Sequence, residues 1–435
     1  MRMIIERTAT SIAVSCLLLS LLLNVARADV VPGDVIDKSN YQKIEGLVPD
    51  FIQEWVKSGD LVMKIGKLNF DPKEFWPAEV KNNRAANTGR YRIDESNGMI
   101  DVKTGQPARD IKGLPFPDPD PNDPTMPVML LWNRQFHEYY LQGPVHEAHY
   151  WLSVSRTGLE KTLLLENLTT PLDPAKDDLD FAQLTIFHEP FNLSGVGTLA
   201  IYSLYPLKSG IRYAITPELR RLKRMSHRIA GSDVYFGLDN APDDCWSGGP
   251  KTNMETGVYR YIGEREALIP YVSENPTVFP RNEKGEIDCG YANTGILKRL
   301  GFEDPNWKGA PWHPVDIIWV KSKAWVIESR SKTPGYAYGP CEGWIEKGTN
   351  FNCYKRITDP NGKLWKGVYW PAMAMDAQDG RFRLVTDCGW YEVDMRRDHG
   401  SALTQSFRKG AFRKIFATDM NKDLFTQAGF VKFCQ

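Results

Sequence analysis

The sequence predicts a mainly β fold with a few helices and a large antiparallel sheet. From Val128 onward, apolar and aromatic runs of roughly five to nine residues alternate with Gly, Pro, Asn and Asp, as in strands joined by turns. Asp359-Pro360-Asn361-Gly362 and Asp379-Gly380 are hairpin-turn signals. No helical spacers separate the runs. The pattern therefore favours antiparallel pairing over a doubly wound parallel sheet.

A few helices are expected. Apolar residues recur at helical spacing over Asp50–Ser58, and Gly59 is a stop signal. Short helices are also predicted at 296–300 and within 405–427. The candidate strands are 128–140, 147–157, 161–168, 180–188, 197–206, 211–216, 316–321, 323–330, 343–347, 351–358, 363–370, 381–387 and 390–395.

Three segments lack regular periodicity. Residues 81–110 are polar and are predicted to form loops with short hairpins. Residues 113–127 contain six prolines, which excludes a helix there and prevents the acidic stretch from wrapping around a calcium ion. Residues 229–314 are dense in Gly, Pro, Asn and Asp. They are predicted to form a loop-rich excursion over the sheet, pinned by a disulfide.

Residues 1–28 have the pattern of a cleavable signal peptide. Arg2 and Arg7 precede an apolar core from Ala9 to Val25, and Ala26-Arg27-Ala28 supplies small residues for cleavage. The alternative is a retained membrane anchor. We expect a mature chain from about Asp29, forming a single domain over 29–435 in the periplasm of a Gram-negative cell.

The charge balance limits the class of partner. The chain has 54 Lys and Arg residues and 54 Asp and Glu residues. Nucleic-acid binding needs clustered positive charge, so a general nucleic-acid binder is excluded.

Six cysteines follow the signal peptide, an even number that predicts three disulfides in an exported protein. The favoured pairs are Cys341–Cys353, Cys245–Cys289 and Cys388–Cys434, although the sequence leaves the other pairings open. No CxxC pair is present, which disfavours a zinc site.

No motif for catalysis or metal binding emerges. His146 and His149 are three residues apart, whereas a zinc helix needs two histidines four apart; on a strand, residues three apart point to opposite faces. A GxSxG turn is absent, and Ser194-Gly195-Val196-Gly197 lacks the lysine of a phosphate loop. No catalytic residue, metal or cofactor is therefore predicted.

Four pairs of segments follow one another along the chain: Gly113–Pro117 with Trp132-Asn133, Thr216–Arg224 with Asp243-Asp244, Ile317–Val320 with Trp325–Glu328, and Tyr354–Asp359 with Gly362–Trp365. In this order they resemble the bacterial domain-of-unknown-function family 1329, often labelled outer-membrane lipoprotein-sorting proteins. The resemblance implies a fold related to LolA and LolB, a strongly curved antiparallel half-barrel around helices with an apolar interior. It also implies acyl-chain binding and a gene setting shared with exporters of hydrophobic compounds. The six cysteines and the 229–314 excursion depart from a minimal LolA-like domain.

Two sets of residues are candidates for binding. Several strands are apolar on both faces, which would leave one face for a ligand if the sheet curves. The candidate ligand contacts are Trp132, Phe136, Trp151, Trp319, Trp325, Tyr354 and Trp390. The candidate charged pairs or head-group contacts are Arg220, Arg221, Arg224, Asp243 and Asp244; a solvated strand face is the alternative.

These observations predict a periplasmic carrier for a hydrophobic molecule: a lipid, an acyl chain, a sterol-like compound or a lipoprotein. An inner-membrane exporter or an outer-membrane protein is the candidate partner. A secreted hydrolase or carbohydrate-active enzyme, and a structural adaptor of an envelope complex, are the alternatives.

Overall fold

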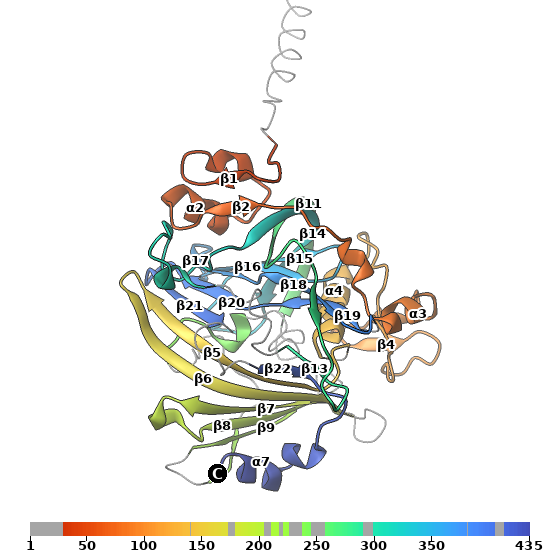
Figure 1. The fold of residues 1–435 in the computed structure, drawn as a ribbon. Coiled ribbons are helices and arrows are strands. Elements are labelled where there is room, and N and C mark those ends of the chain that lie inside the picture. The colour runs from red at the N-terminus through yellow and green to blue at the C-terminus, as the bar shows by residue number, and fades with distance from the viewer. Residues whose placement is uncertain are drawn as a thin grey trace, which may run out of the picture.

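The computed structural model describes residues 29–139, 141–172, 179–203, 210–216, 221–225, 237–244, 257–289, 299–380, 382–404 and 413–435. The predicted signal peptide lies outside these residues, as do Arg220, Cys245 and most of the predicted helix 296–300. The described chain forms a large curved sheet with short helices around it and one helix inside its curve (Figure 1).

Within the described residues, twenty strands belong to one sheet. They are β1 (Val35–Ile36), β2 (Met63–Ile65), β5 (Val145–Ser155), β6 (Gly158–Pro171), β7 (Leu179–Glu189), β8 (Gly197–Ser203), β9 (Ile211–Ile215), β10 (Lys223–Met225), β11 (Gly257–Tyr271), β12 (Thr277–Phe279), β13 (Ile287–Asp288), β14 (Ile318–Ser331), β15 (Cys341–Glu346), β16 (Asn352–Thr358), β17 (Leu364–Tyr369), β18 (Ala372–Ala377), β19 (Arg383–Asp387), β20 (Trp390–Asp394), β21 (His399–Thr404) and β22 (Arg413–Phe416). A separate hairpin joins β3 (Tyr91–Ile93) to β4 (Met99–Asp101).

The helices are few and short. The α-helices are α2 (Asp50–Ser58), α3 (Ala78–Asn87), α4 (Met126–Tyr139) and α7 (Gln427–Phe433). The 3-10 helices are η1 (Tyr41–Ile44), η2 (Pro72–Glu74), η3 (Phe191–Leu193), η4 (Pro242–Asp244), η5 (Gly301–Glu303) and η6 (Lys422–Phe425). None of the helices in the described part of the chain is long and apolar enough to cross a membrane.

Antiparallel pairing runs through most of the sheet. The order is β10, β9, β8, β7, β6, β5, β21, β20, β17, β16, β15, β14, β11, each strand antiparallel to the next. Parallel pairs occur where β2 meets β14 and where β18 meets β11 and β12. No described pairing joins β10 to β11, so the sheet is open. The predicted mainly β, antiparallel fold is confirmed.

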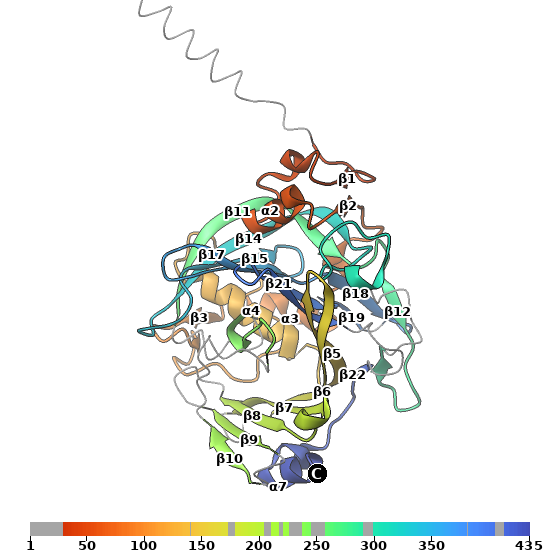
Figure 2. The same cartoon turned by 90° about the vertical axis from the view of Figure 1, so that its left-hand side faces the viewer.

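The sheet bends around helix α4. Figures 1 and 2 place α4 between the part of the sheet that contains β11 and β14 and the part that contains β7 and β8. The helix contacts both β11 and β6. Its side chains are buried on every side from Met126 to His137, and Trp132 is fully buried with its Nε1 donating to the Asn97 carbonyl at 2.9 Å. Among the described residues, α4 therefore fills the inner side of the curve.

The predicted strand 128–140 is wrong, because these residues form α4. Helix α4 buries the polar residues Asn133, Arg134, Gln135 and His137 together with its apolar ones. No exposed polar stripe therefore distinguishes its apolar run from that of a buried strand. The prolines before it do not prevent the helix: Pro127 lies in its first turn, where a proline is tolerated.

The predicted helix Asp50–Ser58 is confirmed with the same bounds. Phe51, Ile52, Trp55 and Val56 are buried, and Gly59 ends the helix in the left-handed conformation at φ +87°. The helix packs on β17 at Gly367, where a Cβ atom would lie 2.5 Å from the Phe51 ring. Glycine here lets the helix approach the sheet on the face opposite α4.

Three further predicted segments differ from the structure. Residues 81–87 of the predicted loop region 81–110 belong to α3, whereas β3 and β4 supply the short hairpin expected there. The 229–314 excursion contains β11, the longest described strand, which pairs with β14 along its whole length. Alternating polar residues such as Glu264 and Glu266 on its exposed part hid this strand from a search for apolar runs. The region 405–427 contains β22, which pairs with β5, although helix was predicted there.

The predicted disulfides are not supported. Cys341 and Cys353 are free, buried thiols. Cys341 faces Ile357, whereas Cys353 lies at the other end of the same hairpin, so their sequence spacing reflects strand length and not proximity. Cys289 and Cys434 are also free thiols, so the Cys388–Cys434 and Cys245–Cys289 pairs are without support.

Replacing Trp132 by alanine is expected to cost about 3–5 kcal/mol of unfolding free energy, because it leaves a cavity inside the curve of the sheet. Urea denaturation measures this cost. Phe191→Ala is the matched control, since Phe191 is 95% exposed and its loss should change stability by less than about 0.5 kcal/mol. Equal effects of the two substitutions would contradict the burial of α4.

His313 should make stability depend on pH. Its ring lies 4.9 Å from that of Trp55, centroid to centroid, and its Nδ1 is hydrogen-bonded to the Tyr369 hydroxyl at 3.1 Å. Burial lowers its pKa from 6.5 to about 3, so the folded state holds it neutral, and its contribution is lost as pH falls below 6.5. When the pH falls from 7 to 5, the unfolding free energy of the wild type should decrease by about 2 kcal/mol more than that of His313→Gln. Urea denaturation at each pH measures this difference. Parallel pH profiles for the two proteins would refute this.

Candidate functional site

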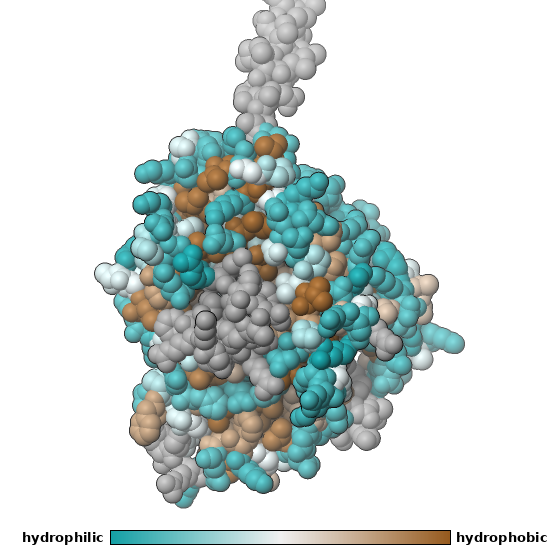
Figure 3. Space-filling view, in the orientation of Figure 1, coloured by the Kyte–Doolittle hydropathy of each residue, from teal (hydrophilic) through white to brown (hydrophobic). Residues whose placement is uncertain are grey.

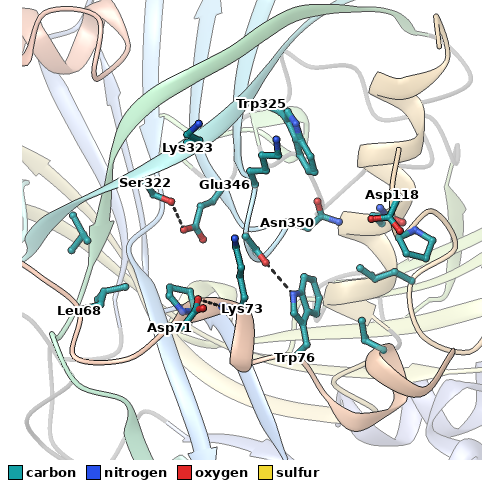
Figure 4. A pocket seen from close by; sticks show the side chains of 18 of the residues that line it. Leu68, Asp71, Lys73, Trp76, Asp118, Ser322, Lys323, Trp325, Glu346 and Asn350 are labelled. Atoms are coloured by element: carbon teal, nitrogen blue, oxygen red, sulfur yellow. Dashed lines mark hydrogen bonds between the residues drawn. The ribbon is translucent and has the colours of Figure 1, made fainter. Parts of the chain in front are cut away.

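A cleft of about 1280 Å³ lies where several segments of the chain meet. Residues 67–84, the loop 114–121, the middle of β14 and the turn between β15 and β16 form most of its lining (Figure 4). Pockets for drug-sized ligands typically measure about 300–1,000 Å³, so this cleft is large. It is the candidate functional site.

A capped turn and an indole hydrogen bond position one wall of the cleft. Asp71 caps η2 by accepting a hydrogen bond from the Lys73 backbone N–H at 2.9 Å, and Pro72 occupies the first turn. Trp76 Nε1 donates to the Gly348 carbonyl at 3.0 Å and so ties this segment to the β15–β16 turn. Figure 4 shows Lys73 between Asp71 and Trp76, with Glu346 and Asn350 across from it.

The lining of the cleft is partly apolar. Leu68, Phe70 and Trp76 are only partly buried, although their size would favour full burial. The apolar lining residues are Leu68, Phe70, Trp76, Val80, Leu114, Val320 and Trp325.

The charged lining residues are mostly basic. Arg84 pairs with Asp118, and Lys347 pairs with Glu264 at 2.5 Å. Lys323 lies between Glu264 and Glu266 at 3.3 and 3.6 Å. The basic residues are Lys67, Lys73, Lys81, Arg84, Lys321, Lys323 and Lys347, and the acidic ones are Asp71, Asp118, Glu266 and Glu346.

Glu346 is the buried acid of the cleft, with 2% of its surface exposed. It accepts hydrogen bonds from Ser322 Oγ at 2.7 Å, from the Tyr271 hydroxyl at 3.2 Å and from Thr349 Oγ1. Burial raises its pKa, and the three hydroxyl donors partly oppose that rise. Its oxygen atoms are used within the protein.

Of the aromatic residues predicted to bind ligand, Trp325 lines the cleft. The remaining predicted contacts are buried in the core: Trp132, Phe136, Trp151, Trp319, Tyr354 and Trp390. Trp151 and Trp390 meet edge to face at 5.7 Å. The structure does not gather the seven residues around one hollow, and ligand contact by the six core residues stays a prediction.

Sequence reasoning missed Leu68, Phe70, Lys73 and Trp76. The available signal was the stretch Lys67–Trp76, which mixes basic and large apolar side chains. Because this stretch contains Asn69 and Pro72, no helix or strand was assigned to it. It becomes part of a cleft only in the folded chain, where it lies across β14.

The predicted charged pairs separate in the structure. Arg221 and Arg224 are exposed, whereas Asp243 and Asp244 are buried. Asp244 Oδ2 accepts from Lys366 Nζ at 2.7 Å, and Asp243 accepts from the Tyr336 hydroxyl. Pairing of Asp244 with the basic run is therefore corrected to pairing with Lys366, on a strand that the sequence did not connect with it.

Lys366 lies at the centre of a buried ionic cluster. Its ammonium also lies 3.0 Å from Glu392 Oε1, and all three side chains are at most 1% exposed. Burial opposes ionisation of Asp244, but the charges of Lys366 and Lys355 outweigh it and lower the pKa. Burial and the neighbouring Asp244 raise the pKa of Glu392 well above its usual value. The cluster fastens residues 239–244 to β17 and β20.

Ser153, His399 and Asp239 form an arrangement that resembles a hydrolase triad. Ser153 Oγ lies 3.3 Å from His399 Nε2, and His399 Nδ1 contacts Asp239 Oδ2. Ser153 is 3% exposed within β5, and Glu160 also contacts His399 Nε2, at 3.2 Å. Burial opposes protonation of His399, but the two carboxylates outweigh it and raise the pKa, which disfavours the neutral base that catalysis requires.

The other described histidines are engaged within the protein or buried in it. His149 is buried on β5, and His137 lies on α4 with Nδ1 3.0 Å from Arg134 Nη1. His146 and His188 each contact one oxygen of Glu166, at 2.5 and 2.8 Å. Across the described ranges, no group of His, Cys, Asp and Glu residues has the geometry to hold a metal ion.

The sequence matches one family model, "Protein of unknown function (DUF1329)", over residues 35–428. No curated protein matches it. Among solved structures, it is similar to a domain from Vibrio parahaemolyticus that is described as an outer membrane lipoprotein-sorting protein domain. The two chains are 14% identical, the match covers 72% of this chain and 100% of that chain, and the TM-score is 0.45. A DUF1329 family protein from Desulfovibrio piger has 10% identity, 65% and 90% coverage and a TM-score of 0.41. A LolA superfamily protein from Nitrosomonas europaea has 9% identity, 69% and 98% coverage and a TM-score of 0.37.

Removing the cation of the buried cluster should be costly. Lys366→Met leaves Asp244 without its nearest positive charge, and we expect a loss of about 3–5 kcal/mol in urea unfolding. The double variant Lys366→Met/Asp244→Asn should recover about half of this, since it also removes the stranded charge. A double variant no more stable than the single one would contradict the pairing.

Proposed function

Because this chain belongs to the DUF1329 family, whose description assigns no function, we propose its function from its own residues: it is a periplasmic carrier that binds a hydrophobic ligand in the cleft beside β14. The ligand is held by burial of apolar surface, without bond chemistry. The signal-peptide pattern of residues 1–28 supports export.

The observation that carries the proposal is the apolar lining of the cleft. Leu68, Phe70 and Trp76 are partly exposed where they line the cleft. Covering apolar surface is favourable by roughly 25 cal/mol per Å², so a ligand that covers these side chains gains affinity from each. Among the described residues, the inner side of the curve is filled by α4.

A secreted hydrolase is the second candidate, and the Ser153–His399–Asp239 arrangement is the observation in its favour. Burial of Ser153 and the Glu160 contact to His399 weigh against it. Labelling of Ser153 by a fluorophosphonate probe, lost in Ser153→Ala, would support the hydrolase.

A structural adaptor is the third candidate and would need a large exposed apolar patch for its partner. On the face seen in Figure 3, the described apolar residues lie in small groups between hydrophilic ones. This face therefore gives no support to the adaptor.

The proposal predicts that the neutral fluorophore N-phenyl-1-naphthylamine binds the purified protein. Leu68→Asp should weaken its binding about ten-fold, because it places a charge against the apolar lining. Val278→Asp is the matched control: Val278 is 53% exposed and outside the cleft, and its substitution should leave binding unchanged.

Organic extraction of the purified protein followed by mass spectrometry supplies an independent test. The expected result is a co-purified apolar molecule that is depleted in Leu68→Asp. A protein that yields no such molecule and does not bind the fluorophore is not a carrier of this kind.

A further inference from the structure

The cleft carries an excess of positive charge. Seven of its lining side chains are basic and four are acidic. Two of the acids are already neutralised by ion pairs, Asp118 by Arg84 and Glu266 by Lys323. Glu346 is buried and saturated with hydroxyl donors, and burial favours its neutral form. The acids of the lining therefore leave part of the basic charge uncompensated.

Two of the basic groups have no partner among the residues that the structure describes. Among the described residues, the ammonium groups of Lys67 and Lys73 make no ion pair or hydrogen bond; only the backbone N–H groups of these residues donate. The other basic side chains are engaged, Arg84 with Asp118, Lys347 with Glu264, Lys321 with Asp29 and Lys81 with the Glu74 carbonyl.

Lys73 is positioned within the cleft. Its backbone is fixed by the Asp71 cap of η2. Its aliphatic stem lies over Gly348, where a Cβ atom would be 3.4 Å from Lys73 Cγ and 3.8 Å from Lys73 Cε. Figure 4 shows the side chain projecting into the middle of the cleft, with Leu68 on one side and Trp76 on the other. A cation thus stands beside the most exposed apolar surface of the site.

We infer that the ligand is an anionic amphiphile of the fatty-acid class, whose carboxylate meets the Lys73 ammonium while its chain covers Leu68, Phe70 and Trp76. This inference rests on the proposed function and adds the chemistry of the polar end. A lysine presents a compact point charge, which suits a monoanionic carboxylate. The guanidinium fork that favours bidentate phosphate binding is not available here, because Arg84 is paired with Asp118.

Calorimetry with three twelve-carbon probes tests the inference: dodecanoate, dodecanol and dodecyltrimethylammonium. The wild type should bind dodecanoate about ten-fold more tightly than dodecanol, and the cationic probe most weakly. Added sodium chloride should weaken dodecanoate binding and leave dodecanol binding unchanged, since salt screens the exposed pair.

Lys73→Gln should lose the preference for dodecanoate and retain the affinity for dodecanol, and Lys73→Glu should favour the cationic probe. The matched control is Lys308→Gln, an exposed lysine outside the cleft, which should behave as the wild type. Lys73 is exposed, so thermal unfolding should be the same in all variants.

The outcomes separate the two proposals. Equal binding of the three probes, or a dodecanoate preference that survives Lys73→Gln, would overturn the head-group inference and leave the carrier intact. Binding of none of the probes, together with no uptake of N-phenyl-1-naphthylamine, would overturn the carrier itself.

Discussion

Burial of α4 on every side is the constraint on which the rest of the molecule depends. A helix with no exposed face requires other elements to cover its whole circumference. The antiparallel sheet meets this need by bending, so that β11 contacts one side of α4 and β6 another. The curvature of the sheet and the position of α4 thus depend on each other, because the bent sheet is what buries the helix.

This arrangement moves the candidate binding site away from the inside of the sheet. With α4 and residues 239–244 on the inner face, the free apolar surface lies beside β14, where the segment 67–84 crosses the sheet. The two inner elements are held differently. α4 is held by apolar packing and by buried hydrogen bonds of Trp132 and Asn133. Residues 239–244 are held largely by Lys366, Lys355 and His399.

The sequence predicted those elements whose residue pattern is local. The helix Asp50–Ser58 has one apolar face and a glycine stop, and the strands from β14 to β20 alternate with clear turns. The pattern failed where burial is total or absent, as at α4 and on the exposed part of β11. The site was harder still. Trp325 was found because it is aromatic on a strand, but Lys73 and Leu68 acquire their role only from the contact of η2 with the β15–β16 turn.

The basic run that was predicted to pair with Asp243 or Asp244 places positive charge on an edge strand of the sheet. β10 consists of Lys223, Arg224 and Met225, all exposed, and its outer side pairs with no described strand. An unpaired edge strand can pair with a strand of a second molecule. Short edge strands and positively charged side chains on them disfavour such pairing. Repulsion between the Lys223 and Arg224 side chains of neighbouring molecules would therefore oppose edge-to-edge aggregation at high protein concentration.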